Sequence, residues 1–295
     1  MYLSVFLRRK TALVALFLGL SMLYSCSSSM DEVSVNQKSR VRIDVRTFQF
    51  DIEDEPMRTA RSISDAATRL SFAVFDSEGA LVGSAIHQNS SADDFGTVEL
   101  ELYPGNYRMV AVAHNADEDA AITSTTSVTL PGTTFTDTFS KVQDLTVEPD
   151  EDCSFTMQLP RATSAFILRI TDTPPTNLKE IKVIVNNLGY EPTSLKINPD
   201  TQLAENTWKQ TRIIPVANLS NEEPIYFIKL YKATTVNIVA TAYATDGSEI
   251  ISHTINNVSL TPNQKTIATG HFFNPKVSGT FTLETTWSTD NEIEY

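Results

Sequence analysis

Residues 98–112 read VELELYPGNYRMVAV, and this stretch indicates how the chain folds. Its first three apolar residues alternate with glutamates, which is the period of two of a strand with one buried face. Pro104 and Gly105 then supply the preset φ and the positive φ that a tight turn requires. The apolar run that follows predicts another strand over residues 108–114, so the segment predicts a strand, a turn and a strand.

The same signals extend toward both ends of the chain. Residues 41–45 alternate between apolar and charged side chains. Residues 70–86 predict a hairpin whose turn contains Gly79, and residues 236–255 predict another hairpin. Residues 111–122 are the one stretch that favours a short helix. Further strands are expected at residues 145–147, 154–159, 165–170, 181–185, 208–214, 226–230, 265–272 and 280–287.

Many short strands between turns predict an all-β fold. They outnumber the roughly seven strands of one sandwich, so we expect two tandem β-sandwich domains, at residues 40–158 and 159–295.

The N-terminal segment has the pattern of an export signal. A basic patch at residues 8–10 precedes an apolar run over residues 11–23, which is shorter than the roughly 20 residues of a transmembrane helix. A lipobox-like site follows, with Ser25 before the cleavage point and Cys26 after it. These features predict a lipoprotein signal peptide over residues 1–25.

We therefore expect Cys26 to be acylated, with palmitate among its chains, and residues 26–39 to form a tether. An ordinary signal peptide that happens to contain a cysteine is the alternative. Removing residues 1–25 takes away three basic side chains and no acidic one, so the net charge falls from −13 to −16. Such a charge argues against nucleic acid as a partner. Cys153 is then unpaired, and its strand-like surroundings predict a small packing residue.

No motif predicts an enzyme or a cofactor. The histidines have no metal-binding spacing, and the sequence contains neither a nucleophile elbow nor a phosphate-binding glycine loop. The acidic runs at residues 115–119 and 148–152 are typical of solvated turns. A calcium loop over the first run would need a glycine where Ala120 stands. The four histidines are His87, His114, His253 and His271.

Several of these features together resemble the fimbrillin superfamily of the Bacteroidetes. They are the lipobox-like Cys26, the early strand, the Pro-Gly-x-Tyr turn at residues 104–107 and the segment at residues 158–166. The resemblance implies two transthyretin-like β-sandwich domains. It also implies a fimbrial subunit that is lipid-anchored and surface-exposed at the cell outer membrane, assembles with other subunits by donor-strand exchange and supports adhesion. Most such subunits are cut after an arginine, for which Arg58 and Arg61 are the candidates here.

Other functions remain open at this stage. A glycan-binding surface lipoprotein of a polysaccharide-uptake system would use exposed aromatic rings, and a secreted hydrolase is a third class. Within the fimbrial class, the sequence does not distinguish stalk, anchor and tip subunits. The strand at residues 280–287 either completes its own sheet, which we favour because an acidic tail follows it, or acts as a donor. The candidate aromatic residues are Trp208, Tyr226, Phe227, Tyr231 and Tyr243.

Overall fold

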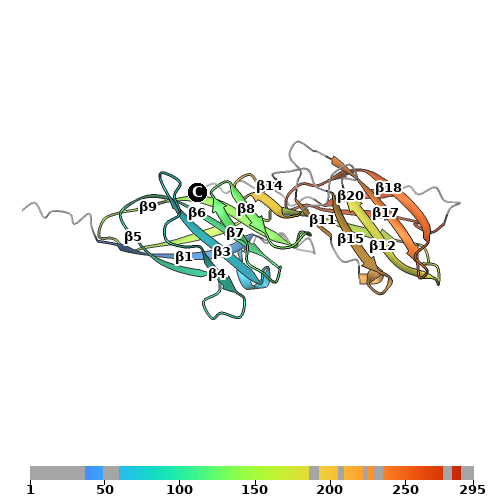
Figure 1. Cartoon of the computed structure of the whole chain (residues 1–295), viewed down its shortest axis with the longest axis horizontal. Helices are drawn as coiled ribbons and strands as arrows, with labels where there is room; N and C mark the ends of the chain where they lie inside the picture. Colours follow the sequence, from blue (N-terminus) through green and yellow to red (C-terminus); the bar gives the residue numbers. More distant parts are fainter. Residues whose placement is uncertain are drawn as a thin grey trace, which may run out of the picture. The chain divides into compact units, whose positions relative to one another are not determined.

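The computed structural model describes residues 37–48, 60–185, 193–204, 209–221, 225–228, 235–274 and 281–286 (Figure 1). Strands dominate this part of the chain, and its two helical segments are short 3₁₀ turns, η1 (Ile63–Asp65) and η2 (Val216–Asn221). The predicted all-β fold is therefore confirmed. None of the helices in the described part is long and apolar enough to cross a membrane.

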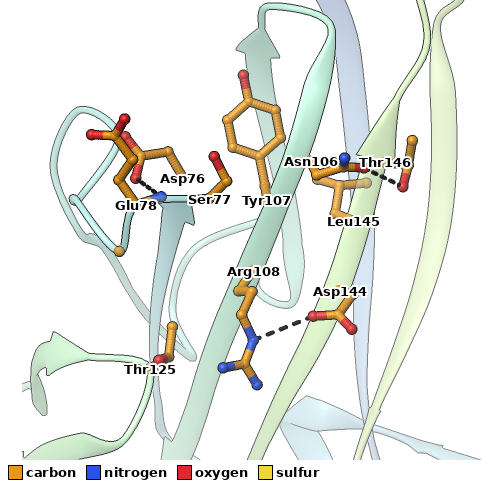
Figure 2. Close-up of a pocket in the computed structure, with 11 residues that line it drawn as sticks. Asp76, Ser77, Glu78, Asn106, Tyr107, Arg108, Thr125, Asp144, Leu145 and Thr146 are labelled. Carbon is orange, nitrogen blue, oxygen red and sulfur yellow. Dashed lines mark hydrogen bonds and ion pairs between the residues drawn. The ribbon is translucent and has the colours of Figure 1, made fainter.

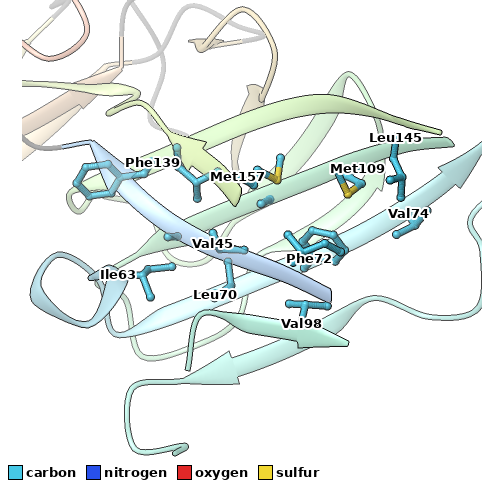
Figure 3. Close-up of a cluster of buried hydrophobic side chains, with 14 of the residues drawn as sticks. Val45, Ile63, Leu70, Phe72, Val74, Val98, Met109, Phe139, Leu145 and Met157 are labelled. Atoms are coloured by element: carbon cyan, nitrogen blue, oxygen red, sulfur yellow. The ribbon is translucent and has the colours of Figure 1, made fainter. Parts of the chain in front are cut away.

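The first sandwich is built from two four-stranded sheets. Sheet A contains β10 (Cys153–Leu159), β1 (Ser39–Phe48), β2 (Ala60–Ser62) and β5 (Thr97–Leu102). Sheet B has the order β4 (Ile86–Asn89), β3 (Arg69–Asp76), β6 (Gly105–His114) and β9 (Thr138–Val147). Apolar side chains from both sheets form one continuous core, which Figure 3 shows converging from β1, β3, β6 and β9.

Sheet B is buried on both faces. Leu70, Phe72 and Val74 of β3 face sheet A, whereas Ala73 and Phe75 belong to a second core under sheet C. Sheet C has the order β14 (Leu203–Ala204), β13 (Leu195–Asn198), β8 (Ser127–Leu130) and β7 (Ala121–Ser124). A strand that is covered on both sides has no polar face, so its sequence loses the alternation of an ordinary antiparallel strand.

Strands β13 and β14 form an arm that comes from the later part of the chain. Leu195 lies opposite Leu130, and Ile197 lies opposite Val128, in the antiparallel pairing of β13 with β8. Both arm residues are buried in the second core. Ser140 of β9 also donates a 3.2 Å hydrogen bond from Oγ to the Pro199 carbonyl. The later part of the chain thus completes a core around sheet B.

The second sandwich holds a third apolar core between sheets D and E. Sheet D has the order β16 (Ile225–Ile228), β11 (Thr163–Ile170), β19 (Lys265–Gly270) and β20 (Thr282–Thr286). Sheet E has the order β15 (Gln210–Pro215), β12 (Leu178–Val185), β17 (Thr235–Ala244) and β18 (Glu249–Ser259). The expected domain limits at residues 40, 158 and 295 stay predictions.

One local prediction is wrong and a second is right only in part. The expected helix at residues 111–122 is instead the end of β6, a turn and the start of β7, because residues 109–114 are buried on both faces of sheet B. The hairpin at residues 70–86 exists, but its second strand, β4, begins only at Ile86 and pairs with β3 up to Asn89. Before it, Leu81 makes a single bridge to Phe75.

Candidate functional site

Strand β1 lies in the interior of sheet A, with partners along both of its edges. On one edge it runs parallel to β10, with Val41 opposite Cys153 and Thr47 opposite Leu159. On the other edge it is antiparallel to β5 over its first half and to β2 over its last three residues. The first described strand of the chain is therefore held by hydrogen bonds on both sides.

The inward face of β1 is apolar and completely buried. Val41 and Ile43 are 0% exposed and Val45 is 3% exposed. They pack in the core with Leu70 and Phe72 of sheet B. Burying a side chain of this size contributes about 1.5–3 kcal/mol, so the three together represent a large share of the about 5–15 kcal/mol that stabilises a typical domain.

The outward face of β1 is basic, and its neighbours are acidic. Arg40, Arg42 and Arg46 are exposed. Arg42 forms a 2.8 Å ion pair from its guanidinium to Oε1 of Glu99, and Arg40 lies opposite Glu101 in the same pairing with β5. These are cross-strand pairs of opposite charge, which stabilise an antiparallel pairing modestly.

The start of β1 is fixed by contacts at three further points. The backbone N–H of Arg40 donates a 2.9 Å hydrogen bond to Oδ1 of Asp152. Ser39 donates from Oγ to the Glu148 carbonyl at 3.1 Å. The Lys38 ammonium lies 5.2 Å from the centre of the Tyr103 ring, within the range of a cation–π contact.

A close backbone approach marks the place where β5 gives way to β2 along β1. The N–H of Val45 donates a 2.7 Å hydrogen bond to the carbonyl of Gly96. Gly96 has φ of +94°, and a Cβ there would lie 2.5 Å from Cγ2 of Ile63. A surface pocket of about 380 Å³ opens at this junction. Only glycine fits the junction without displacing its neighbours.

Of the two arginines predicted as cleavage sites, only one lies among the described residues. Arg61 lies in β2, where its backbone is opposite Thr47 of β1. Arg58 lies outside the described residues, as do Ser25 and Cys26. The structure therefore shows that β2 and β1 are paired, and the lipidation site stays a prediction.

The expected C-terminal strand is present in sheet D. β20 pairs antiparallel with β19, from Thr282 opposite Thr269 to Thr286 opposite Lys265. Phe281 precedes it and makes edge contacts with the rings of His253 and Phe272. In this structure the strand completes the sheet of its own sandwich, which is the arrangement that the acidic tail favours.

The candidate aromatic platform is not assembled in the described residues. Trp208 and Tyr231 lie outside them. Tyr226 and Phe227 are in β16 of sheet D, whereas Tyr243 is half-buried in β17 of sheet E. The described aromatic candidates thus come from two different sheets.

A second pocket, of about 550 Å³, lies over the ends of β3, β6 and β9 (Figure 2). Its polar groups bond largely to one another. Arg108 contacts Asp144 at 3.3 Å between Nε and Oδ1, and Thr146 donates a 3.0 Å hydrogen bond to Asn106. The Tyr107 hydroxyl, whose pKa is raised by partial burial and by the nearby Asp76 carboxylate, donates to the Tyr103 carbonyl at 2.8 Å.

The histidines and cysteine do not converge on a reaction centre. In the part of the chain that the structure describes, no three His, Cys, Asp or Glu side chains are grouped as metal ligands. Cys153 is half-buried at the start of β10, where burial and the nearby Asp152 raise the pKa of its thiol. A raised pKa keeps the thiol protonated, which suits a packing role.

Sequence reasoning missed the acidic residues beside β1. Glu99 and Glu101 were visible as the polar positions of an alternating strand, but their pairing with Arg42 and Arg40 joins segments 57 and 61 residues apart. Nothing in a single sequence identifies such a partner.

The comparisons with known proteins agree with this fold. Residues 31–159 match the model of the family of fimbrillin-A associated anchor proteins Mfa1 and Mfa2. The resemblance to fimbrillins is thereby confirmed over the residues that include sheets A and B. No curated protein matches the sequence.

Solved structures share the fold at low sequence identity. A candidate adhesin from Bacteroides ovatus is 11% identical, with a TM-score of 0.51 over 86% of this chain and 96% of that one. A fimbrial assembly protein from Parabacteroides distasonis is 13% identical, with a TM-score of 0.50 over 84% and 98%. The fimbrial anchor protein Mfa2 from Porphyromonas gingivalis is 13% identical, with a TM-score of 0.48 over 84% and 97%. At these identities the likeness concerns the fold alone.

Proposed function

We propose that this chain, whose residues 31–159 match the fimbrillin-A anchor family, is a non-enzymatic fimbrial subunit or anchor that joins other subunits by strand exchange at the position of β1. It is displayed on the outer membrane as a lipoprotein through Cys26 and supports adhesion. The names of two similar structures, which describe an adhesin and a fimbrial assembly protein, support this class.

The observation that carries the proposal is the interior position of β1. Removing an inner strand exposes the backbone groups of β10 and β5, and opens an apolar groove where Val41, Ile43 and Val45 were buried. A groove between two unpaired strand edges accepts a foreign strand through backbone hydrogen bonds, while alternate side chains enter its pockets.

The limits of β2 favour Arg58 over Arg61 as the point of cleavage. β2 spans Ala60–Ser62, so a cut after Arg58 leaves it whole, whereas a cut after Arg61 divides it. A protease that cut after Arg61 would first have to separate β2 from β1. We therefore expect Arg58 to be the site at which an arginine-specific protease releases β1.

Limited digestion of the mature chain with an arginine-specific protease tests the proposal. The unmodified chain and Arg61→Gln are expected to release the segment that contains β1 and then to form ladders on SDS gels without boiling. Arg58→Gln is expected to stay intact and monomeric, with Arg61→Gln as its matched control. A chain that has lost β1 yet remains a monomer with an unchanged melting temperature would contradict strand exchange.

The lipid anchor requires a separate test. Cys26→Ala is expected to abolish the incorporation of labelled palmitate and to release the protein from membranes or leave it unprocessed. Cys153→Ala is the matched control. Cys153 lies in β10, so this substitution is expected to leave the palmitate labelling unchanged. Labelling that persists in Cys26→Ala would show that Cys26 is not the anchor.

The glycan-binding alternative has the pocket of Figure 2 as its best location. Most of the polar groups there already bond to one another, so a sugar would have to displace the Arg108–Asp144 pair. Retention of the chain on a polysaccharide gel, abolished by Asn106→Ala and Thr146→Ala together, would favour this alternative over the fimbrial one.

A further inference from the structure

Beside the first half of β1, the walls of the groove are acidic wherever they carry charge, whereas β2 places Arg61 opposite Thr47 at the other end. β5 contributes Glu99 and Glu101, and the loop before β10 contributes Asp152. Neither β5 nor β10 contains a lysine or an arginine. When β1 leaves, Glu99 and Glu101 lose the arginines opposite them, and Asp152 loses the hydrogen bond from the Arg40 backbone N–H.

The present occupant of the groove is matched to that charge. Arg42 contacts Glu99 at 2.8 Å, and Arg40 lies opposite Glu101. Arg46, by contrast, lies opposite Gln158 of β10 and Ser62 of β2, which are both uncharged. The groove thus offers a carboxylate to two of the three arginines of the strand and no charge to the third.

Resting on the proposed function, we propose that the groove selects its donor by charge. The partner is a strand of another subunit that alternates apolar side chains with lysine or arginine at the positions of Arg40 and Arg42. To replace β1 it must run parallel to β10 and antiparallel to β5. Complementary charge of this kind sets partner choice and register more than it sets affinity.

The C-terminal segment of this chain has the opposite character. Residues 277–295 contain four acidic side chains and no basic one. Like charges directly opposite one another in a sheet are destabilising. The groove therefore disfavours the C-terminal strand of a second copy, so the chain prefers a different subunit with a basic donor strand, and identical copies join only when no such subunit is present.

Peptide exchange into the full mature chain tests this selection. A specific protease site placed within residues 49–59 allows the chain to be nicked while β1 stays bound in its groove. Fluorescent peptides are then added and their entry is followed by anisotropy. The parent peptide has the sequence of residues 38–48, and the variants carry Arg42→Glu or the matched control Arg46→Glu, which changes the formal charge equally.

We expect Arg42→Glu to weaken entry about fivefold at low ionic strength and Arg46→Glu to change it by less than about twofold. The difference should shrink in about 1 M salt, where the screening length is about 3 Å. Glu99→Arg in the chain should reverse the preference and rescue the Arg42→Glu peptide. A peptide of residues 277–295 should enter less well than the parent.

The outcomes separate this inference from the function on which it rests. Equal entry of the parent, Arg42→Glu and 277–295 peptides would show that the groove recognises only the apolar face of the incoming strand. That result would overturn charge selection but not strand exchange. Failure of the parent peptide to enter at all would overturn strand exchange, and charge selection with it.

Discussion

Arg161 donates a 2.9 Å hydrogen bond from Nε to Oδ1 of Asp137, and both side chains are largely buried. The same oxygen of Asp137 accepts a hydrogen bond from Thr163, the first residue of β11. Arg161 also donates to Asn263 at 3.2 Å and lies over the Phe139 ring. This pair thus joins the start of β9 to the start of β11.

We expect Arg161→Met to lower the free energy of unfolding by about 3 kcal/mol, because it leaves the Asp137 carboxylate buried without its cation. Burial already raises the pKa of Asp137 despite Arg161, and the substitution should raise it further. A raised acidic pKa contributes stability below the unfolded value of about 4, and this stability is lost as the pH rises through the folded value. Urea unfolding from about pH 4 to 8 should therefore show a steeper decline in Arg161→Met. Asp137→Asn in the same background should remove that decline, and parallel pH curves would contradict the interpretation.

Gly96→Ala should destabilise the first sandwich by about 2–4 kcal/mol, from positive φ and overpacking together. Its Cβ would lie 2.5 Å from the buried Ile63 side chain and 3.2 Å from the Val45 carbonyl. Gly79→Ala is the matched control, since Gly79 also has positive φ but no atom within 4 Å of the added Cβ. The control should cost only about 1 kcal/mol in the same thermal unfolding experiment. Equal losses would show that the contact with Ile63 does not matter.

His114 should make the protein sensitive to acid. Burial lowers its pKa to about 4, with Asp119 acting in the opposite direction and Arg69 reinforcing the effect. Its Nδ1 accepts from the Ala116 N–H at 3.2 Å, while its buried Nε2 has no partner among the described residues. The folded state therefore binds fewer protons than the unfolded state between about pH 6.5 and 4, and stability falls as the pH falls through this window.

The loss attributable to His114 should reach about 3 kcal/mol by pH 4, since one pKa unit corresponds to about 1.36 kcal/mol. Chemical unfolding of His114→Gln should show a flatter dependence on pH over the same range. His87→Gln is the control, because His87 is exposed in β4. A wild-type pH dependence that survives in His114→Gln would assign the acid sensitivity to other groups.

Ile197→Ala should destabilise the protein by about 2–4 kcal/mol, as expected for truncating a fully buried isoleucine. Its side chain belongs to the core around Phe75 and Val110 of sheet B. A chain that ends at Leu159 lacks β13 and β14 and exposes this core, so it should bind a hydrophobic dye. Lys196→Ala is the control, because Lys196 is exposed between Leu195 and Ile197. A shortened chain that melts like the complete protein would show that the arm is dispensable.

The sequence predicts strands best where one face meets water. The alternation at residues 41–45 marks β1 correctly, since Val41, Ile43 and Val45 are buried, whereas Arg42 and Asp44 between them are not. The strand expected at residues 108–114 is confirmed by β6, but the helix expected from residue 111 is wrong, because Val110 and Val112 lie under sheet C while Met109 and Ala111 face sheet A. A strand that is buried on both faces has no polar residues alternating with its apolar ones, so its sequence is also compatible with a helix.

The sequence of a strand does not show which other strands it pairs with. β1 could be identified from its own residues, but its parallel neighbour β10 and its acidic neighbour β5 come from distant segments. The pairing of β13 with β8 is similarly invisible, because Leu195 and Ile197 alternate like any half-buried strand. The structure was therefore needed to identify the candidate site, although all of its charged residues are present in the sequence.

The parallel pairing of β1 with β10 also constrains the order of folding. Val41 finds its partner only at Cys153, which lies 112 residues further along the chain. During synthesis from the N-terminus, β1 is therefore made long before one of its two edges has a neighbour. Contacts between such distant residues form slowly, because a long loop must close first. β1 is consequently among the last strands of the first sandwich to be secured, although it is the first of them to be made.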